Sequence, residues 1–425
     1  MTSASASFHR LRGTKDLFGS EASAWDELER RAAEVFARFG FDGVRIPVME
    51  EAALFKRSVG EVTDIVQKEM YAFEDRSGTA VALRPEGTAG IVRAYIENNW
   101  GADGGVGRFW YSGPMFRAER PQAGRLRQFH QIGGEVFGSR SPMADAETIE
   151  VLARILEAVG ITDYRVEMNN LGDPADRAKY TEALNQYLEP HVTKMPTEHQ
   201  DRIRKNPMRF LDSKDPAVAP VIEQAPCISE FLSTESREHF AQVRELIKAS
   251  GISAEVNERI VRGLDYYTHT VFEFKHPQLG AQDALAAGGR YDGLVQTLGG
   301  NAVPAVGFAL GVERLMMIAE KKGIALAVPV SRPAFFIGMD AQSRKDVYAW
   351  ASSLRGRGRR ACVDFEERSL KASLRQANRI QSRCAIILGS QERERGVATV
   401  KDLERGEQQE IPAADVVNYV EKLLS

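Results

Sequence analysis

Apolar residues near the start of the chain recur at helical spacing. Between residues 22 and 39 they fall at steps of three and four, which predicts a long amphipathic helix with one apolar stripe. The stripe consists of Trp25, Leu28, Ala32, Val35, Phe36 and Phe39. The segment VRIPVME follows, and Pro47 confines this short strand to a sheet edge or a strand end. The stripe beside an edge strand predicts a surface for a homodimer.

Short apolar runs separated by Gly-rich turns follow between residues 70 and 140. They are YAFED, VALRP, GRFWYSG and FHQIGGEVFG, and their succession predicts an antiparallel sheet. Helices are expected near residues 87–98 and 145–159, and VEMNNLGD is expected to be a further strand.

The pattern changes to long helical runs with many prolines over residues 173–254, which predicts a mostly helical insertion. Strand-like sequence then returns in RIVRGLDYYTHTVFEFKH and AVGFALGVERL. A sheet begun in residues 1–172 is therefore expected to be completed in residues 255–326. ALAVPVSRP, with its two prolines, predicts a linker. Beyond it strands alternate with helices, which predicts a separate α/β domain over residues 330–425, with helices at 342–355, 368–382 and 413–424.

The composition places the chain among globular proteins of several domains. Its 425 residues allow two to four domains at roughly 100–200 residues each. No run approaches ~18 consecutive apolar residues, and the N-terminus lacks a basic start followed by an apolar stretch. We expect a cytoplasmic protein that contacts no membrane.

Cysteine usage and charge add two expectations. Cys227, Cys362 and Cys384 form no CxxC pair, which argues against a disulfide framework and against a protein-bound zinc. The net charge is −3, yet residues 329–425 hold 17 Lys and Arg against 13 Asp and Glu. This basic excess indicates an anionic partner for the C-terminal part.

The densest chemical signal is GPMFRAERPQAGRLRQFHQIGGEVFG at residues 113–138. Four arginines, Arg117, Arg120, Arg125 and Arg127, surround a Pro-Gln-Ala-Gly loop between two strands. Guanidinium groups bind phosphate through paired charge-assisted hydrogen bonds, so the hairpin is interpreted as a phosphate-binding element. The alternative is an exposed hairpin with solvated arginines. On the second strand, alternation puts Phe129, Gln131 and Glu135 on one face.

Four further segments carry candidate residues. In RGLDYYTHTVFEF, Arg262, Asp265, Tyr266 and Tyr267 are expected on a strand, where the tyrosines alone would favour packing. AAGGRYDGL pairs two glycines before Tyr291, and GFALGVERL leads into a helix whose Arg314, near the N-terminus, favours an anion contact. In LRPEGTAG, Thr88 is expected to cap a helix with Glu86 in solvent.

These segments, together with RGTKD near the start, resemble the histidyl-tRNA synthetase family of class II aminoacyl-tRNA synthetases, in that family's order and over the whole chain. The hairpin resembles class II motif 2, GVERL motif 3 and the Pro47 segment motif 1, while RGLDYY and GGRYDG resemble two histidine-specific blocks. The implied fold is α+β, an antiparallel sheet flanked by helices with a helical insertion, followed by a C-terminal α/β anticodon-binding domain.

The resemblance implies ATP-dependent ligation of L-histidine to tRNA(His) through histidyl-adenylate, with Mg²⁺ carried on the pyrophosphate oxygens. Arg117 and Arg262 would be catalytic, on either side of the α-phosphate. The implied ATP-binding residues are Arg117, Glu119, Arg125, Phe129 and Arg314. The implied histidine-binding residues are Glu86, Thr88, Gln131, Glu135, Arg262, Tyr266, Tyr267 and Tyr291. Imidazole can be recognised between a carboxylate and a phenol, because its ring nitrogens lie on opposite sides.

The tRNA would contact Gln122 and Arg127 at its acceptor end. In RSLKASLRQANRIQSR, basic residues at 368, 371, 375, 379 and 383 fall on one helical stripe, which predicts RNA contacts for Lys371, Arg375 and Arg379. A solvated helix face is the alternative. For the whole chain the alternatives are an RNA-binding module and a non-catalytic regulatory subunit of ATP phosphoribosyltransferase. Members of that second group lack the C-terminal domain and tend to lose the phosphate arginines.

Overall fold

The computed structural model describes residues 8–60, 63, 65–122, 124–211, 213, 215–261, 264–280, 283–327 and 331–424. The chain forms two compact units, residues 1–328 and 329–425. Each unit has its own apolar clusters and its own sheet.

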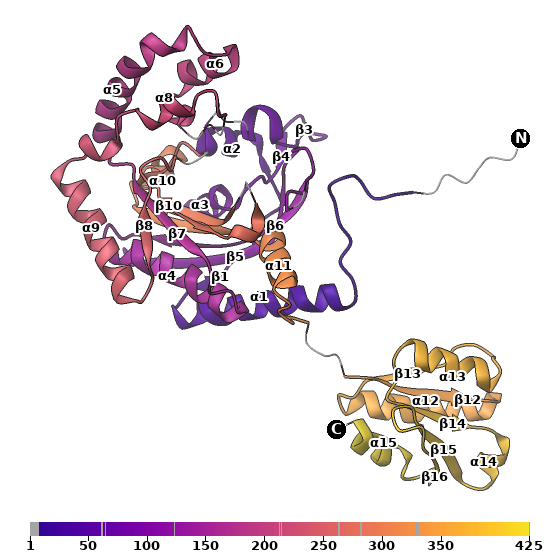
Figure 1. Ribbon diagram of the computed structural model, residues 1–425. Coiled ribbons are helices and arrows are strands. Elements are labelled where there is room, and N and C mark those ends of the chain that lie inside the picture. The colour runs from indigo at the N-terminus through magenta and orange to yellow at the C-terminus, as the bar shows by residue number, and fades with distance from the viewer. Residues whose placement is uncertain are drawn as a thin grey trace, which may run out of the picture. The chain divides into compact units, whose positions relative to one another are not determined.

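An eight-stranded sheet organises the first unit (Figure 1). Its strands in spatial order are β1 (Asp42–Gly43), β5 (Gly107–Phe116), β6 (Gln128–Phe137), β11 (Ala305–Gly311), β10 (Ala284–Arg290), β9 (Thr268–Lys275), β7 (Arg165–Asn170) and β8 (Ala254–Val256). The central pairs are antiparallel, as predicted, whereas the pairs β1–β5 and β7–β8 at the two edges are parallel. The predicted antiparallel sheet is thus found at the centre, and each edge adds a parallel pair, because long connections containing helices join these strands.

A second, three-stranded sheet holds β2 (Met49–Glu51), β3 (Ala72–Glu74) and β4 (Ala80–Leu83), in the order β2-β4-β3. YAFED and VALRP therefore do not join the main sheet, because they pair locally with each other and with β2. Pro47 lies just before the edge strand β2, at a place where its missing N–H costs no ladder hydrogen bond.

Helices cover both faces of the main sheet. On one face pack α1 (Ser20–Arg38), α4 (Pro142–Val159), α9 (Thr234–Ala249) and α11 (Val312–Lys321). On the other lies α3 (Thr88–Glu97). Leu28, Ala32 and Phe36 of α1 are fully buried in the chain's own core. The apolar stripe of α1 therefore packs inside the chain and is not free to form a dimer surface. This corrects the argument that predicted a homodimer from the stripe.

Residues 174–249 contain helices and no strand among those described. These are α5 (Pro174–Val192), α6 (Thr197–Lys205), α7 (Pro207–Phe210), α8 (Ala219–Glu223), a 3-10 turn at Ile228–Glu230, and α9. Leu184, Leu188 and Phe210 share one apolar cluster with the sheet face that α3 covers. The boundaries 173–254 for an insertion stay a prediction. Shorter helical elements elsewhere in the unit are α2 (Ala52–Val59), a π-helix (Ile65–Glu69), a 3-10 turn (Pro277–Leu279) and α10 (Leu294–Thr297).

The second unit is a five-stranded sheet in the order β13-β12-β14-β15-β16. Its elements are β12 (Ala334–Gly338), α12 (Ala341–Gly356), β13 (Ala361–Val363), α13 (Leu370–Arg379), β14 (Cys384–Leu388), α14 (Ser390–Glu394), β15 (Val397–Asp402), β16 (Gln408–Pro412) and α15 (Val416–Leu424). Strands and helices alternate as predicted, although α13 is shorter than 368–382. The α+β fold with a C-terminal α/β domain is confirmed.

Candidate active site

The hairpin of β5 and β6 carries the clustered arginines on its loop, residues 117–127. Beside this loop lies a cavity of about 280 Å³. Ten of the predicted site residues line it: Glu86, Thr88, Arg117, Glu119, Arg125, Phe129, Gln131, Tyr266, Tyr267 and Arg314. The fold therefore brings together residues from four segments that are far apart in the sequence.

Glu135 is fully buried on β6, behind the wall of this cavity. Its carboxylate accepts hydrogen bonds from the hydroxyls of Tyr291 (2.6 Å) and Thr88 (2.8 Å). Burial, helped by the charge of Glu86 and opposed by the two hydroxyl donors, raises the pKa of Glu135 to about 8. A polar floor that reaches the cavity through Thr88 suits a polar ligand.

Glu86 is buried at the start of α3. Its carboxylate accepts hydrogen bonds from the backbone N–H groups of Thr88 (2.7 Å) and Ala89 (2.8 Å). Burial is the main cause that raises the pKa of this carboxyl. The expectation that Thr88 caps the helix beside a solvated Glu86 is wrong: Gly87 is the N-cap and Glu86 satisfies the exposed N–H groups.

Three arginines give the cavity a positive wall. The Arg117 guanidinium lies 5.1 Å from the centre of the Phe129 ring, and its Nε donates to the Pro85 carbonyl at 2.9 Å. Arg125 pairs with Glu119 at 3.0 Å. Arg314, in the first turn of α11, donates to the carbonyls of Ala284 and Gly124. Burial lowers the pKa of Arg314, and nearby Arg125 lowers it further, as expected where cations converge on a site for anions.

Gln131 and two tyrosines complete the wall. Within the described part of the chain, the buried Oε1 of Gln131 has no hydrogen-bond partner, so it can accept from a ligand. The rings of Tyr266 and Tyr267 lie 4.7 Å apart, and Tyr266 lies 5.6 Å from the ring of Tyr291. Tyr266 and Tyr267 stand in the turn before β9 and not on the strand as expected, because β9 begins only at Thr268.

The described residues offer neither a metal-binding cluster nor a helix that could span a membrane. In them, no group of three or more His, Cys, Asp or Glu side chains is arranged to hold a metal ion. Among the same residues, no helix combines the length and the apolar character that crossing a membrane requires.

Comparison with known proteins identifies the family. The family model for histidyl-tRNA synthetase matches residues 13–315, and that for the anticodon-binding domain matches residues 325–423. A histidine--tRNA ligase of Halothermothrix orenii is 42% identical over 413 residues, 97% of this chain and 99% of the relative. The chain belongs to the histidyl-tRNA synthetase family. It is thus an aminoacyl-tRNA synthetase by family, as the motifs indicated.

Solved structures agree with this assignment. The apo histidyl-tRNA synthetase of S. aureus is 32% identical with a TM-score of 0.82, and the match covers 98% of this chain and all of that one. An ATP phosphoribosyltransferase regulatory subunit/histidyl-tRNA synthetase from Bacillus halodurans is 20% identical over 90% of this chain and 98% of that one, with a TM-score of 0.65. This second likeness shows the fold alone.

Gln122 and Arg127, which the synthetase resemblance implies as tRNA contacts, do not line the cavity. Arg262 is outside the described residues. Gln122 pairs through its backbone with Arg125 across the hairpin loop, and the Arg127 N–H donates to the Gly13 carbonyl at 2.7 Å. The RGTKD segment thus holds the base of the synthetase motif 2 loop.

The helix α13 of the anticodon-binding domain carries three of the five basic residues that were predicted to form one stripe. Lys371, Arg375 and Arg379 lie exposed on α13. Arg368 precedes this helix, and Arg383 follows it and pairs with Asp402 and Glu404. Arg383 is therefore part of the domain's own structure.

Two residues near the synthetase site were not singled out from the sequence. Glu313 lines the cavity and accepts from the His130 N–H at 2.9 Å. Tyr111 is buried on β5, and its ring would lie 2.2 Å from a Cβ at Gly87. Alternation along GRFWYSGPMF puts Tyr111 on the same face as Phe109 and Gly113, and this signal could have found it.

Proposed function

We propose that this chain ligates L-histidine to tRNA(His) in two steps, through histidyl-adenylate, with release of pyrophosphate and then AMP. One observation carries the proposal: a buried carboxylate, Glu135, bonded to Tyr291 and Thr88, lies behind a cavity whose outer wall bears Arg117, Arg125 and Arg314. A buried polar group selects a ring that forms hydrogen bonds, and arginines suit a triphosphate.

Histidine occupies the inner end of the cavity in this proposal. Glu135 and the phenols of Tyr291 and Tyr267 recognise the imidazole by hydrogen bonds to its ring nitrogens, with Tyr266 packed beside them. The α-amine contacts Glu86, Thr88 and Gln131, which supply acceptor oxygens. The buried and unpartnered Oε1 of Gln131 supports this orientation. An apolar amino acid would leave these groups unpaired, and sites of this kind reject such a competitor by a factor of order ~10⁴–10⁵.

ATP occupies the outer end, with Mg²⁺ carried on its phosphates. Phe129 stacks on adenine, Glu119 accepts from it, and Arg125 and Arg314 hold the γ-phosphate end. A histidine carboxylate oxygen attacks the α-phosphorus, and the bond to the bridging oxygen of pyrophosphate breaks. Arg117 and Arg262 neutralise the charge that builds up on the α-phosphate oxygens, so catalysis is electrostatic and positional.

Transfer then moves the histidyl group to a terminal ribose hydroxyl of tRNA, releasing AMP. Gln122 and Arg127 contact the acceptor end, and Lys371, Arg375 and Arg379 contact the anticodon end. The exposure of these three side chains on α13 supports that role. A homodimer, a cytoplasmic location and the absence of protein-bound zinc belong to the same proposal.

ATP–pyrophosphate exchange with single amino acids tests it. Histidine alone should support exchange, because only a synthetase exchanges and only with its own amino acid. Absence of exchange with all amino acids, combined with histidine binding, would favour the regulatory-subunit alternative. Exchange with another amino acid would show that the imidazole pocket is misassigned.

A further inference from the structure

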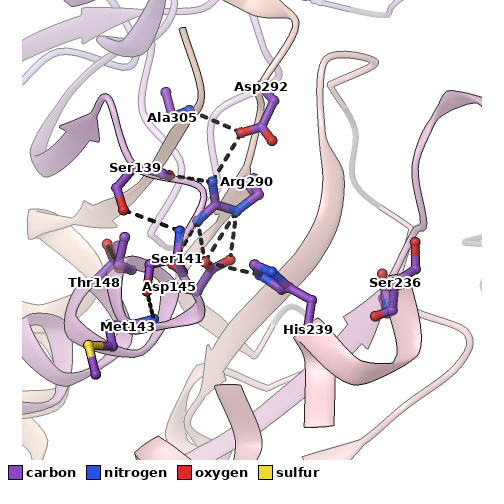
Figure 2. Close-up of polar contacts among 12 residues, drawn as sticks. Ser139, Ser141, Met143, Asp145, Thr148, Ser236, His239, Arg290, Asp292 and Ala305 are labelled. Atoms are coloured by element: carbon purple, nitrogen blue, oxygen red, sulfur yellow. Dashed lines mark hydrogen bonds and ion pairs between the residues drawn. The ribbon is translucent and has the colours of Figure 1, made fainter. Parts of the chain in front are cut away.

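Behind the proposed histidine pocket lies a buried charged network centred on Arg290, the last residue of β10 (Figure 2). The Arg290 side chain is 1% exposed. Its Nε and one terminal nitrogen bind Asp145, which is fully buried in the first turn of α4. The pair belongs to none of the roles assigned above.

Every N–H of the Arg290 guanidinium has an acceptor. Besides Asp145, the group donates to the Ser139 carbonyl at 2.8 Å, to Asp292 at 3.1 Å and to the Ser141 carbonyl at 3.3 Å. Ser139 follows β6, the strand that carries Glu135. Arg290 therefore joins the end of β6, the start of α4 and the turn after β10 in one fixed geometry.

Tyr291 is the next residue, and hydrogen bonds tie this turn to Ala305 at the start of β11. The Tyr291 N–H donates to the Ala305 carbonyl at 2.7 Å. The Ala305 N–H donates in turn to Asp292 Oδ1 at 3.1 Å, and the same oxygen accepts from Arg290. The position of the Tyr291 hydroxyl, 2.6 Å from Glu135, thus depends on contacts that Arg290 organises.

The network also reaches the helical segment. His239 of α9 lies 3.3 Å from Asp145 Oδ2 through its Nε2 (Figure 2). Although burial alone would raise it, the hydrogen bond from His239 and the charge of Arg290 hold the pKa of Asp145 below its usual value. Asp145 is thus a carboxylate partner for Arg290 and not a neutral acid.

We propose that Arg290 and Asp145 are positioning residues for histidine selection, which set Tyr291 against Glu135 without touching the ligand. The inference rests on the proposed function of the Glu135 pocket. A buried ion pair gives little net stability compared with apolar packing, so stability alone does not account for this pair. The planar guanidinium of Arg290, with five N–H donors in fixed directions, does account for the alignment of the two strands β6 and β10.

Arg290→Lys tests the proposal, because lysine keeps the charge but cannot reach four acceptor groups at once. A displacement of about 1 Å in a site costs up to ~100-fold. We expect the KM for histidine in pyrophosphate exchange to rise about 10- to 100-fold, with the KM for ATP changed less than about 3-fold. The selectivity for histidine over β-(2-thienyl)alanine, which lacks ring nitrogens, should fall in the same variant. Equal changes in both KM values would overturn the proposal.

Two comparisons separate positioning from general destabilisation. Glu167→Gln removes another buried, paired carboxylate, bonded to Lys275 and Asn257 at the far edge of the sheet. It should lower the urea midpoint without changing selectivity. In a Tyr291→Phe background, Arg290→Lys should add little further loss, because Arg290 acts through the Tyr291 hydroxyl. Additive losses would contradict the inference.

The experiment also distinguishes failure of the inference from failure of the proposed function. If Glu135→Gln and Tyr291→Phe leave the KM for histidine unchanged, the pocket itself is misassigned. Asp292→Ala, at a partly exposed partner of Arg290, is a second test of the network. If Glu135→Gln and Tyr291→Phe raise the KM for histidine while Arg290→Lys and Asp292→Ala leave it unchanged, only the positioning role is wrong.

Discussion

At the scale of single residues, Glu135 combines complete burial with two hydroxyl donors, and within the part of the chain that the structure describes it forms no ion pair. Leaving a buried hydrogen-bonding group without its partner costs about 1–3 kcal/mol. Glu135→Gln is therefore expected to raise the KM for histidine about 10- to 100-fold in pyrophosphate exchange and to leave the KM for ATP within about 2-fold. A parallel rise in both constants would place Glu135 outside the imidazole pocket.

The same residue predicts a pH dependence of stability. Burial raises the pKa of Glu135 to about 8 from 4.5, so the native carboxyl keeps a proton that the unfolded chain releases between these values. Unfolding then releases a proton, and the contribution of Glu135 to the free energy of unfolding falls as pH rises from about 5 to about 8.

Urea denaturation at pH 5, 6, 7 and 8 measures this contribution. Relative to the wild type, Glu135→Gln should gain stability as the pH rises, because an amide does not titrate. If the two midpoints keep a constant difference across this range, the carboxyl does not titrate in it.

At the scale of elements, the strand β11 leaves room for the Glu135 carboxylate only because residue 307 is glycine. A Cβ at Gly307 would lie 1.6 Å from Glu135 Oε2 and 2.7 Å from the Gly134 carbonyl. Gly307→Ala should therefore cost about 1–3 kcal/mol of stability through overpacking and also raise the KM for histidine. Gly105→Ala is the matched control, since nothing lies within 4 Å of its Cβ position. Unchanged histidine kinetics in Gly307→Ala would mean that the carboxylate is not held there.

Elements set by local periodicity could be predicted from the sequence. The first helix was expected at residues 22–39 and lies at Ser20–Arg38, and the arginine hairpin and the α/β domain followed from their own patterns. The sequence could not predict that β2, β4 and β3 form a separate sheet, or that the edge pairs β1–β5 and β7–β8 are parallel. Pairing between strands far apart in the sequence leaves no local signal. The strand β16 could not be predicted for another reason: its sequence, QQEIP, is mostly polar and exposed, so it lacks the alternation of apolar residues that indicates a strand, although it pairs with the neighbouring β15.

In the candidate active site, too, local patterns could be predicted from the sequence and long-range contacts could not. Alternation on β6 predicted that Gln131 and Glu135 share a face. The capping role of Glu86 could not be predicted, because it depends on a turn at Gly87 that is packed against Tyr111 of another strand. The contact between Asp145 and Arg290 joins residues 145 positions apart, so only the folded chain shows it.

At the scale of the whole molecule, the separation into two units predicts that the two reaction steps can be divided. Residues 1–328 hold the cavity and every described residue proposed for histidine and ATP. A chain ending near residue 328 should keep histidine-dependent pyrophosphate exchange while losing most tRNA charging. Loss of both activities in a folded fragment would show that adenylation needs the second unit.

The basic face of α13 gives the most specific prediction for that unit. The helices α13 and α12 pack on opposite faces of the sheet. Basic residues on α12 therefore serve as a control for those on α13. Arg375→Gln with Arg379→Gln should weaken tRNA binding and lower the slope of log K against log salt by about 1.4–1.8, since about 0.7–0.9 counterions are released per phosphate contact. Lys345→Gln with Arg355→Gln on α12 removes equal charge and should leave the slope unchanged. If both pairs lower the slope equally, tRNA responds to the net charge of the domain and not to the α13 stripe.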